Sequence, residues 1–266
     1  MAGRERLIGA PTRGTTNPNR LRRVDRWLTA DPAVVRLLRS CSGDPPLVVD
    51  LGYGASPVTT VEMARRLRTV RPDIRVLGLE LDAERVAVAQ AAAGPSLEFR
   101  RGGFELAGTR PSLVRAFNVL RQYDETEVAQ AWQLMLDRLA PGGLLVEGTC
   151  DEIGRLCTWV TVSSSGPRSL TLSCKVSTLD RPSTMAERLP KILIHRNVPG
   201  ERVHDLMSTL DICWATAAPH QAFGARARWV HTVQLLTQRG WPVQGRPSRW
   251  RLGELTLPWP SVQPQP

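Results

Sequence analysis

Several residue types are scarce in this chain of 266 residues, and each shortage excludes a class of protein. The five cysteines stand far apart and form no C-x-x-C pair, so neither a disulfide framework nor a zinc site is indicated. The four histidines show no ligand spacing, and we expect no metal. No apolar run approaches the roughly 18 residues that cross a bilayer, and the N-terminus lacks the apolar core of a signal peptide. We therefore expect a cytoplasmic protein without a membrane partner.

Lysine is almost missing as well. Only Lys175 and Lys191 are present, so the formal charge of +10 comes almost entirely from arginine. The densest basic stretch is NRLRRVDR, residues 19–26. Clustered cations bind nucleic-acid phosphates, and they also occur on the solvated face of an ordinary amphipathic helix. Both interpretations stay open, with RNA as the partner in the first.

The first 150 residues alternate between short apolar runs and helical patterns. Leu47–Leu51 has the character of a buried parallel strand, and Thr59-x-x-Glu62 is a capping-box pattern at a helix start. Asp82 and Asp124 are placed to cap two further helices. The predicted strands are 47–51, 74–79, 97–100, 113–117 and 144–148. The predicted helices are 24–38, interrupted near Asp31-Pro32, and 59–67, 83–93 and 125–139. This alternation predicts right-handed βαβ units and a parallel sheet with helices on both faces.

The pattern changes after Thr149. Residues 157–176 read as two strands around a Ser-Gly-Pro turn, three helical stretches follow at 183–195, 201–217 and 224–239, and a last strand lies within 248–259. We expect one domain, 1–266. It divides into an N-terminal arm or lid (1–20), a cofactor-binding core (21–149), and completing strands with a helical insertion on the acceptor side (150–266).

The stretch LVVDLGYGASP, residues 47–57, is the most informative part of the sequence. A parallel strand here delivers two glycines to the carboxyl edge of the sheet, where ligands bind. A dinucleotide fingerprint needs a third glycine, and Pro57 stands in its place. A nicotinamide oxidoreductase is therefore disfavoured, and Asp50 ahead of the glycines suits a ligand with a cationic group.

Four motifs in order resemble the class I S-adenosylmethionine-dependent methyltransferases, over about residues 47–149. VVDLGYG is similar to the first motif, VLGLELD to the second, RRGGFEL and RAFNVL occupy the third and fourth positions, and LAPGG is similar to the turn before the fifth strand. The resemblance implies a Rossmann-like sheet, mostly parallel with an antiparallel C-terminal strand, and S-adenosyl-L-methionine as cofactor. The third motif departs from the family, because Gly103 stands where an aspartate is common.

The resemblance also implies site residues. The acid of the first motif interacts with the methionine end of the cofactor, and Glu80 of the second holds both ribose hydroxyls, which suits a carboxylate with two acceptor oxygens. Phe104 stacks on the base, and Glu105 is a candidate for the missing acceptor. The cofactor-binding residues expected are Asp50, Gly52, Tyr53, Gly54, Glu80, Leu81, Gly103, Phe104 and Asn118.

Catalytic residues cannot be carried over from a shared motif, because transfer of an activated methyl group mainly requires orientation of the acceptor. Tyr123 and His195 are the candidates, each with an ordinary alternative: Tyr123 as a packing residue at a helix start, His195 as a cap or packing residue. The stretch TRGTTNPNR, residues 12–20, is rich in hydrogen-bonding groups, and we expect this stretch to fold over the active site, so that its deletion abolishes activity while sparing the fold.

These features predict a methyltransferase that acts on an unidentified acceptor, most simply a small molecule. One alternative is an RNA methyltransferase that holds phosphates with the basic N-terminal helix. A second is a non-catalytic cofactor-binding module, which the altered third motif keeps open.

Overall fold

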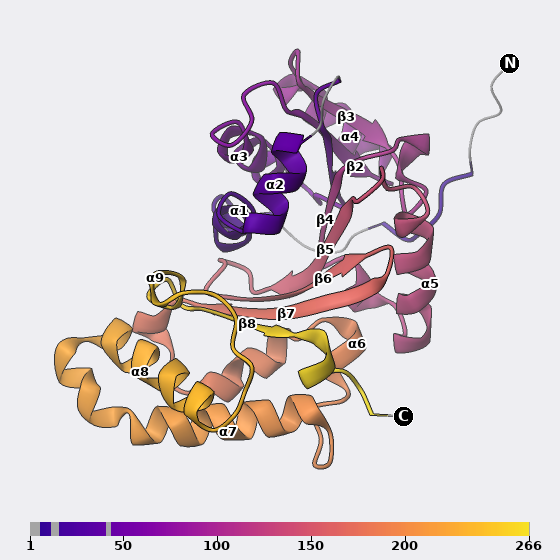
Figure 1. Ribbon diagram of the computed structural model, residues 1–266. Coiled ribbons are helices and arrows are strands. Elements are labelled where there is room, and N and C mark those ends of the chain that lie inside the picture. The colour runs from indigo at the N-terminus through magenta and orange to yellow at the C-terminus, as the bar shows by residue number, and fades with distance from the viewer. Residues whose placement is uncertain (1–5, 12–15, 41–43, 266) are drawn as a thin grey trace, which may run out of the picture. The chain divides into compact units, whose positions relative to one another are not determined.

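The computed structural model describes residues 6–11, 16–40 and 44–265 (Figure 1). Residues 12–15 of the predicted arm lie outside this set. The chain groups into two compact units, one of Met1–Gly154 with Val162–Gly166, the other of Arg155–Thr161 with Pro167–Pro266. Each unit is described by itself below, and the single domain expected from the sequence stays a prediction.

The first unit is built on five parallel strands. They are β1 (Leu47–Leu51), β2 (Arg75–Glu80), β3 (Leu97–Arg101), β4 (Leu113–Phe117) and β5 (Leu144–Cys150), in the order β3-β2-β1-β4-β5. The central strand β1 pairs in parallel with both β2 and β4, for example Val49 with Leu77 and Val114. Its residues are apolar apart from one acid, because both faces of a parallel sheet are covered by helices.

Helices lie on both sides of these strands. The α-helices are α1 (Arg22–Leu28), α2 (Pro32–Ser40), α3 (Val58–Leu67), α4 (Ala83–Ala89) and α5 (Glu125–Leu136). Figure 1 shows α1, α2 and α3 on one side of the strands and α5 on the other. Asp82 caps α4 by accepting from the N–H groups of Glu84 and Arg85, and Glu127 completes a capping box with Asp124 at α5, as predicted.

The capping box predicted at Thr59 is wrong. Helix α3 begins at Val58, after Pro57, so Thr59 and Thr60 already lie buried in its first turn. The carboxylate of Glu62 instead accepts from the N–H of Asn19, at 2.9 and 3.0 Å. The capping-box pattern is present in the sequence, but Glu62 binds the segment before α1 and not the N-terminus of α3.

The second unit contains the strands β6 (Leu156–Ser163), β7 (Gly166–Cys174) and β8 (Glu254–Pro258), and β7 and β8 pair antiparallel. Its long helices are α7 (Arg202–Thr216) and α8 (Ala225–Gln238), joined by the 3-10 helix η6 (Ala218–Phe223). Trp214 and Trp229 pack between α7 and α8 with ring centroids 6.4 Å apart, and the guanidinium of Arg228 lies 3.8 Å over the Trp214 ring.

The helix predicted over 183–195 is broken. The 3-10 helix η5 (Pro182–Arg188) comes first, and one short α-helical turn, α6 (Lys191–Ile194), follows. Pro190 causes the break, since a proline pushes the preceding residue out of the helical region, and Leu189 has ψ 143°. In class the fold is as predicted: a Rossmann-like α/β arrangement of parallel strands with an antiparallel C-terminal strand, β8.

Candidate active site

A pocket lies in the first unit at the carboxyl ends of the parallel strands. Along the sheet, the order of the strands reverses between β1 and β4, and open α/β sheets bind their ligands at this point. The pocket has about 240 Å³ of empty space, including the part open to solvent. The lining residues are Ile8, Gly9, Ala10, Leu51, Gly52, Glu80, Leu81, Gly102, Gly103, Phe104, Val119 and Tyr123.

The glycine turn after β1 forms one wall of this pocket. Gly52 and Gly54 have φ values of 70° and 82°, which side-chain-bearing residues rarely adopt. The N–H of Gly52 donates to the Leu79 carbonyl at 2.7 Å, so the turn is tied to the end of β2. The two glycines are therefore required by the backbone conformation, and they leave main chain bare of side chains at the strand edge.

Glu80 ends β2 beside this turn and is 1% exposed. Its Oε2 accepts from the Gly54 N–H at 3.0 Å and its Oε1 from the Leu81 N–H at 2.9 Å. Arg85 lies 3.7 Å from Oε2. The two backbone contacts orient both carboxylate oxygens of Glu80 at the wall of the pocket.

The third motif forms the opposite wall. Glu105 Oε1 accepts from the Gly103 N–H at 2.7 Å, and Oε2 accepts from the Ile8 N–H at 2.8 Å. The Phe104 N–H donates to the Ile8 carbonyl at 2.8 Å, and the Phe104 ring packs against Tyr123 with centroids 5.4 Å apart. Glu105, the acceptor suggested by the sequence, is not itself a lining residue, and its carboxylate binds the main chain of the lining residues Gly103 and Ile8.

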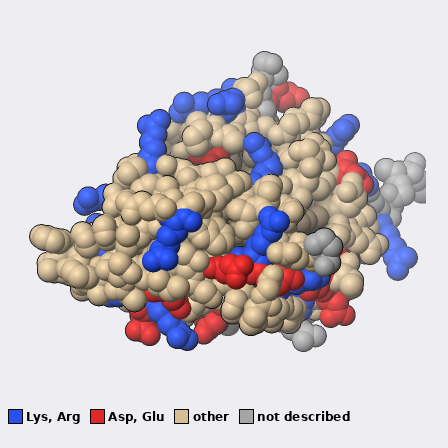
Figure 2. All heavy atoms as spheres, turned by 60° about the horizontal axis from the view of Figure 1, so that its bottom comes forward, with Lys and Arg blue, Asp and Glu red and all other residues tan. Residues whose placement is uncertain are grey.

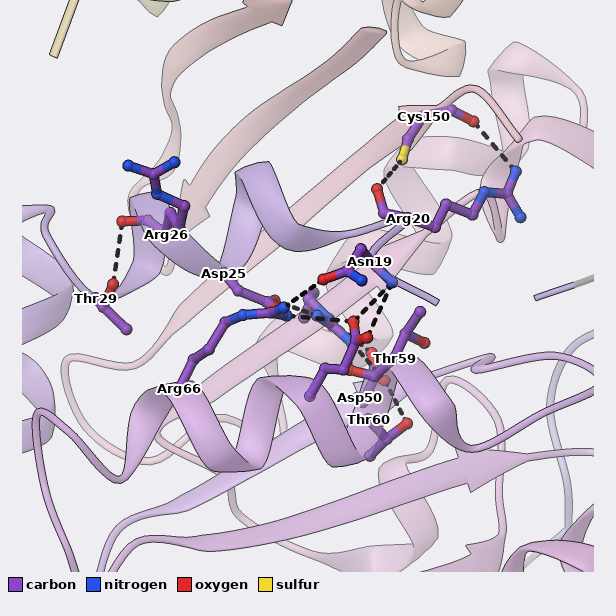
Figure 3. A network of polar contacts seen from close by, with 12 residues as sticks. Asn19, Arg20, Asp25, Arg26, Thr29, Asp50, Thr59, Thr60, Arg66 and Cys150 are labelled. Atoms are coloured by element: carbon purple, nitrogen blue, oxygen red, sulfur yellow. Dashed lines mark hydrogen bonds and ion pairs between the residues drawn. The ribbon is translucent and has the colours of Figure 1, made fainter. Parts of the chain in front are cut away.

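Asp50 lies in a buried ion cluster beside the pocket rather than among the lining residues (Figure 3). Arg115, in the middle of β4 and fully buried, donates from Nε to Oδ1 at 2.9 Å and from Nη2 to Oδ2 at 2.7 Å. The Thr60 hydroxyl adds a hydrogen bond to Oδ2 at 2.6 Å. The predicted contact of Asp50 with the methionine end stays a prediction, and these bonds leave it little free acceptor capacity.

The same cluster reaches α1. Arg115 also forms an ion pair with Asp25, whose other oxygen is 2.5 Å from Arg66 Nη1. Burial opposes the charge of Arg115, but the carboxylates of Asp50 and Asp25 outweigh it and raise the pKa of Arg115 above its ordinary value. Sequence reasoning missed this cluster, although a charged residue in the middle of an apolar strand was a signal that a buried partner exists.

Tyr53 and Asn118, two predicted cofactor-binding residues, contact other residues of the first unit. The Tyr53 ring is 4% exposed and meets Phe99 edge-on at 5.4 Å. Asn118 has φ 61°, and its Oδ1 accepts from the Cys150 N–H at 3.0 Å, which joins the exits of β4 and β5. Neither side chain lines the pocket described above, and their roles in cofactor binding stay predictions.

Of the two catalytic candidates, Tyr123 lines the pocket, and its hydroxyl accepts from the Ala10 N–H. Burial raises the pKa of Tyr123, and the neighbouring Glu127 adds to the rise. The phenol is therefore neutral at pH 7. His195 belongs to the second unit, where it is exposed at the end of α6 with its Nε2 3.2 Å from Lys191 Nζ. Both catalytic roles stay predictions.

The basic stretch at 19–26 has internal partners. Arg20 donates to the carbonyls of Asp151 and Cys150 at 2.8 and 3.2 Å, and Arg23 donates to the Gly154 carbonyl at 3.1 Å. Figure 2 shows one face on which Lys and Arg side chains lie apart, separated by uncharged residues and by Asp and Glu. Part of the basic stretch therefore anchors the start of α1 to the exit of β5.

In residues 6–11, 16–40 and 44–265, no group of three or more His, Cys, Asp and Glu side chains could hold a metal ion. Within the same residues, no helix combines the length and apolar character needed to cross a membrane.

No protein-family model matches the chain, and no curated protein matches it. Among solved structures, it is similar to magnesium protoporphyrin IX methyltransferase from Synechocystis PCC 6803 with bound SAH, at 20% identity over 48% of this chain and 53% of that chain (TM-score 0.37). It is also similar to the plantazolicin methyltransferase BpumL with SAH, at 11% identity over 49% and 48% (TM-score 0.37). A pericyclic reaction enzyme matches at 20% identity over 52% and 33% (TM-score 0.35).

The chain thus spans about half the length of the first two structures and a third of the other. At these TM-scores the likenesses carry no argument about activity. The fold assignment rests on the strand order, and the argument about function rests on the residues of the pocket.

Proposed function

We propose that this chain binds S-adenosylmethionine and transfers its methyl group to an acceptor, a small molecule in the first instance. The observation that carries the proposal is the placement of one buried carboxylate, Glu80, against a left-handed glycine turn at the reversal point of a parallel sheet. The rest of the pocket is chemically consistent with a nucleoside.

Three parts of the pocket fit the cofactor. Glu80 is oriented by two backbone N–H groups, and the two acceptor oxygens of a carboxylate suit two ribose hydroxyls. Main chain at Gly52 allows close approach of a ligand. The N–H of Phe104 and the carboxylate of Glu105 form a donor beside an acceptor, a pair that recognises a base edge.

When bound, the cofactor supplies a methyl group already activated on a sulfonium sulfur. The protein's part is to hold the acceptor in line and to exclude water. Tyr123, a neutral phenol at pH 7, is suited to position an acceptor by a hydrogen bond rather than to remove its proton. His195 remains the candidate base, as predicted from the sequence.

Calorimetric titration tests cofactor binding. We expect S-adenosylmethionine and S-adenosylhomocysteine to bind and NAD to give no heat, because the chain lacks the third glycine of a dinucleotide site. Transfer is tested with methyl-labelled cofactor over cell extracts separated into RNA, protein and small molecules, and we expect label in the small molecules. Binding of NAD in place of the adenosyl compounds would refute the proposal.

Two alternatives have distinct outcomes in the same experiments. A non-catalytic cofactor-binding module is favoured by the pairing of Asp50 with Arg115, which neutralises the acid expected at the methionine end. It predicts cofactor binding with no labelled product. An RNA methyltransferase predicts label in RNA and binding that weakens steeply with salt, but Arg20 and Arg23 already have carbonyl partners.

A further inference from the structure

Residues 6–11, called the arm segment here, lie in the pocket and bind the residues proposed to recognise the cofactor base. Ile8 makes two main-chain hydrogen bonds: its N–H donates to Glu105 Oε2 at 2.8 Å, and its carbonyl accepts from the Phe104 N–H at 2.8 Å. The contact joins residues 97 positions apart in the sequence. Ile8 therefore occupies both the donor, the Phe104 N–H, and the acceptor, the Glu105 carboxylate, on this wall of the pocket.

The next two residues continue along the pocket. Gly9 has φ 129°, and a Cβ there would lie 3.2 Å from the Tyr123 hydroxyl and 3.3 Å from Leu81 Cδ1. The Ala10 N–H donates to the Tyr123 hydroxyl, and the Gln122 side chain donates to the Ala10 carbonyl at 3.1 Å. The arm backbone therefore lies directly against the pocket walls, with little room between them.

The space that remains is small. The empty space is about 240 Å³ and part of it is open to solvent, so the enclosed part is smaller still. A ligand with both a nucleoside and an amino-acid part needs more. Either the ligand is excluded while the arm segment is docked, or the arm segment moves when the ligand enters.

The chemistry of Ile8 indicates which group the arm segment replaces. Adenine carries an exocyclic N–H donor next to a ring-nitrogen acceptor, and the Ile8 main chain presents the same donor beside an acceptor to Glu105 and Phe104. Gly103 agrees with this. A Cβ at position 103 would lie 1.9 Å from the Ile8 carbonyl oxygen, so any residue with a side chain at this position is incompatible with the docked arm segment.

We propose that the arm segment is autoinhibitory: the Ile8 main chain occupies the position of the adenine edge, and cofactor binds only when this segment is released. The inference rests on the proposed function, since it assumes an adenosyl cofactor. It accounts for the altered third motif as an adaptation to the arm, in which Gly103 makes room and Glu105 supplies the acceptor.

The test uses the whole chain with two variants of one residue. Ile8→Pro removes the N–H that donates to Glu105, whereas Ile8→Ala shortens the side chain and keeps both main-chain groups. A hydrogen bond to a charged group shifts such an equilibrium by about tenfold or more. We expect S-adenosylhomocysteine to bind Ile8→Pro at least about tenfold more tightly than the unchanged chain, and Ile8→Ala within about twofold of it.

Amide hydrogen exchange of the unchanged chain gives a second readout that needs no variant. Saturation with S-adenosylhomocysteine should speed exchange at the Ile8 amide, because the ligand displaces it from Glu105. Slower exchange at Ile8, or equal or weaker binding by Ile8→Pro, would overturn the autoinhibitory role and leave the proposed function intact. Failure of all three proteins to bind either adenosyl compound would overturn both.

Discussion

Glu147 makes the stability of the first unit depend on pH. It lies in β5, is 1% exposed, and its Oε2 has no hydrogen-bond partner in the part of the chain that the structure describes. Burial raises the pKa of this carboxyl from 4.5 to about 8, and the Trp132 side chain opposes the rise only in part. The folded protein therefore keeps this proton at neutral pH, and the unfolded chain releases it.

The sign of the effect follows from proton linkage. Between pH 4.5 and 8 the folded state binds more protons than the unfolded state, so unfolding becomes easier as the pH rises. The contribution is full below pH 4.5, decreases across this window and is constant above pH 8. At about 1.4 kcal/mol for each pKa unit, the rise from 4.5 to about 8 corresponds to about 5 kcal/mol lost across the whole window, of which about 3 kcal/mol is lost by pH 7.

Glu147→Gln removes the ionisation and keeps the shape. The free energy of unfolding of both proteins is measured by urea titration between pH 4.5 and 9. Between pH 4.5 and pH 7, we expect the value for Glu147→Gln to rise by about 3 kcal/mol relative to that of the unchanged protein. Glu84→Gln, at an exposed position, is the matched control and should stay close to the unchanged protein at every pH. A difference between Glu147→Gln and the unchanged protein that does not vary with pH would refute the reasoning.

Three further predictions concern the site and its support. Glu80→Gln should weaken S-adenosylhomocysteine binding by about tenfold or more, because a charged acceptor is lost; calorimetry that shows equal affinity would remove Glu80 from the site. Arg115→Leu should cost about 3–5 kcal/mol in urea unfolding, since Asp50 is left buried without its cation and Asp25 keeps only Arg66, and a loss below about 1 kcal/mol would contradict this. Tyr123→Phe should tighten S-adenosylhomocysteine binding severalfold by removing an acceptor of the arm segment, and weaker binding would instead indicate a direct cofactor contact.

The strands of the first unit were predictable because each is a short apolar run followed by a polar turn. β1 and β4 have the predicted bounds. β2 is shifted by one residue, β3 ends one residue later than predicted, and β5 ends two residues later. The caps Asp82 and Asp124 were predictable because a cap acts within three residues of the chain. Local signals of this kind need no knowledge of the rest of the fold.

One wrong prediction and two contacts that the sequence did not indicate have a common cause. Glu62 matched a capping pattern but binds Asn19. Asp50 binds Arg115, which is 65 positions away, and its role at the cofactor stays a prediction. Gly103 was read as a missing acid, although its absent side chain makes room for Ile8. Each side chain has more than one use that fits its local sequence, and a partner distant in the chain decides among them.

The ion cluster around Arg115 also has a consequence for how the first unit folds. Its members come from four elements: Asp25 from α1, Asp50 from β1, Thr60 and Arg66 from α3, and Arg115 from β4. All four elements must be in place before both acids have their cations. Without α1 the Arg115–Asp50 pair stays neutral, but α1 packed without β4 would hold Asp25 buried without Arg115. Helix α1, although it precedes the sheet in the chain, is thereby committed to the same cooperative transition as the central strands.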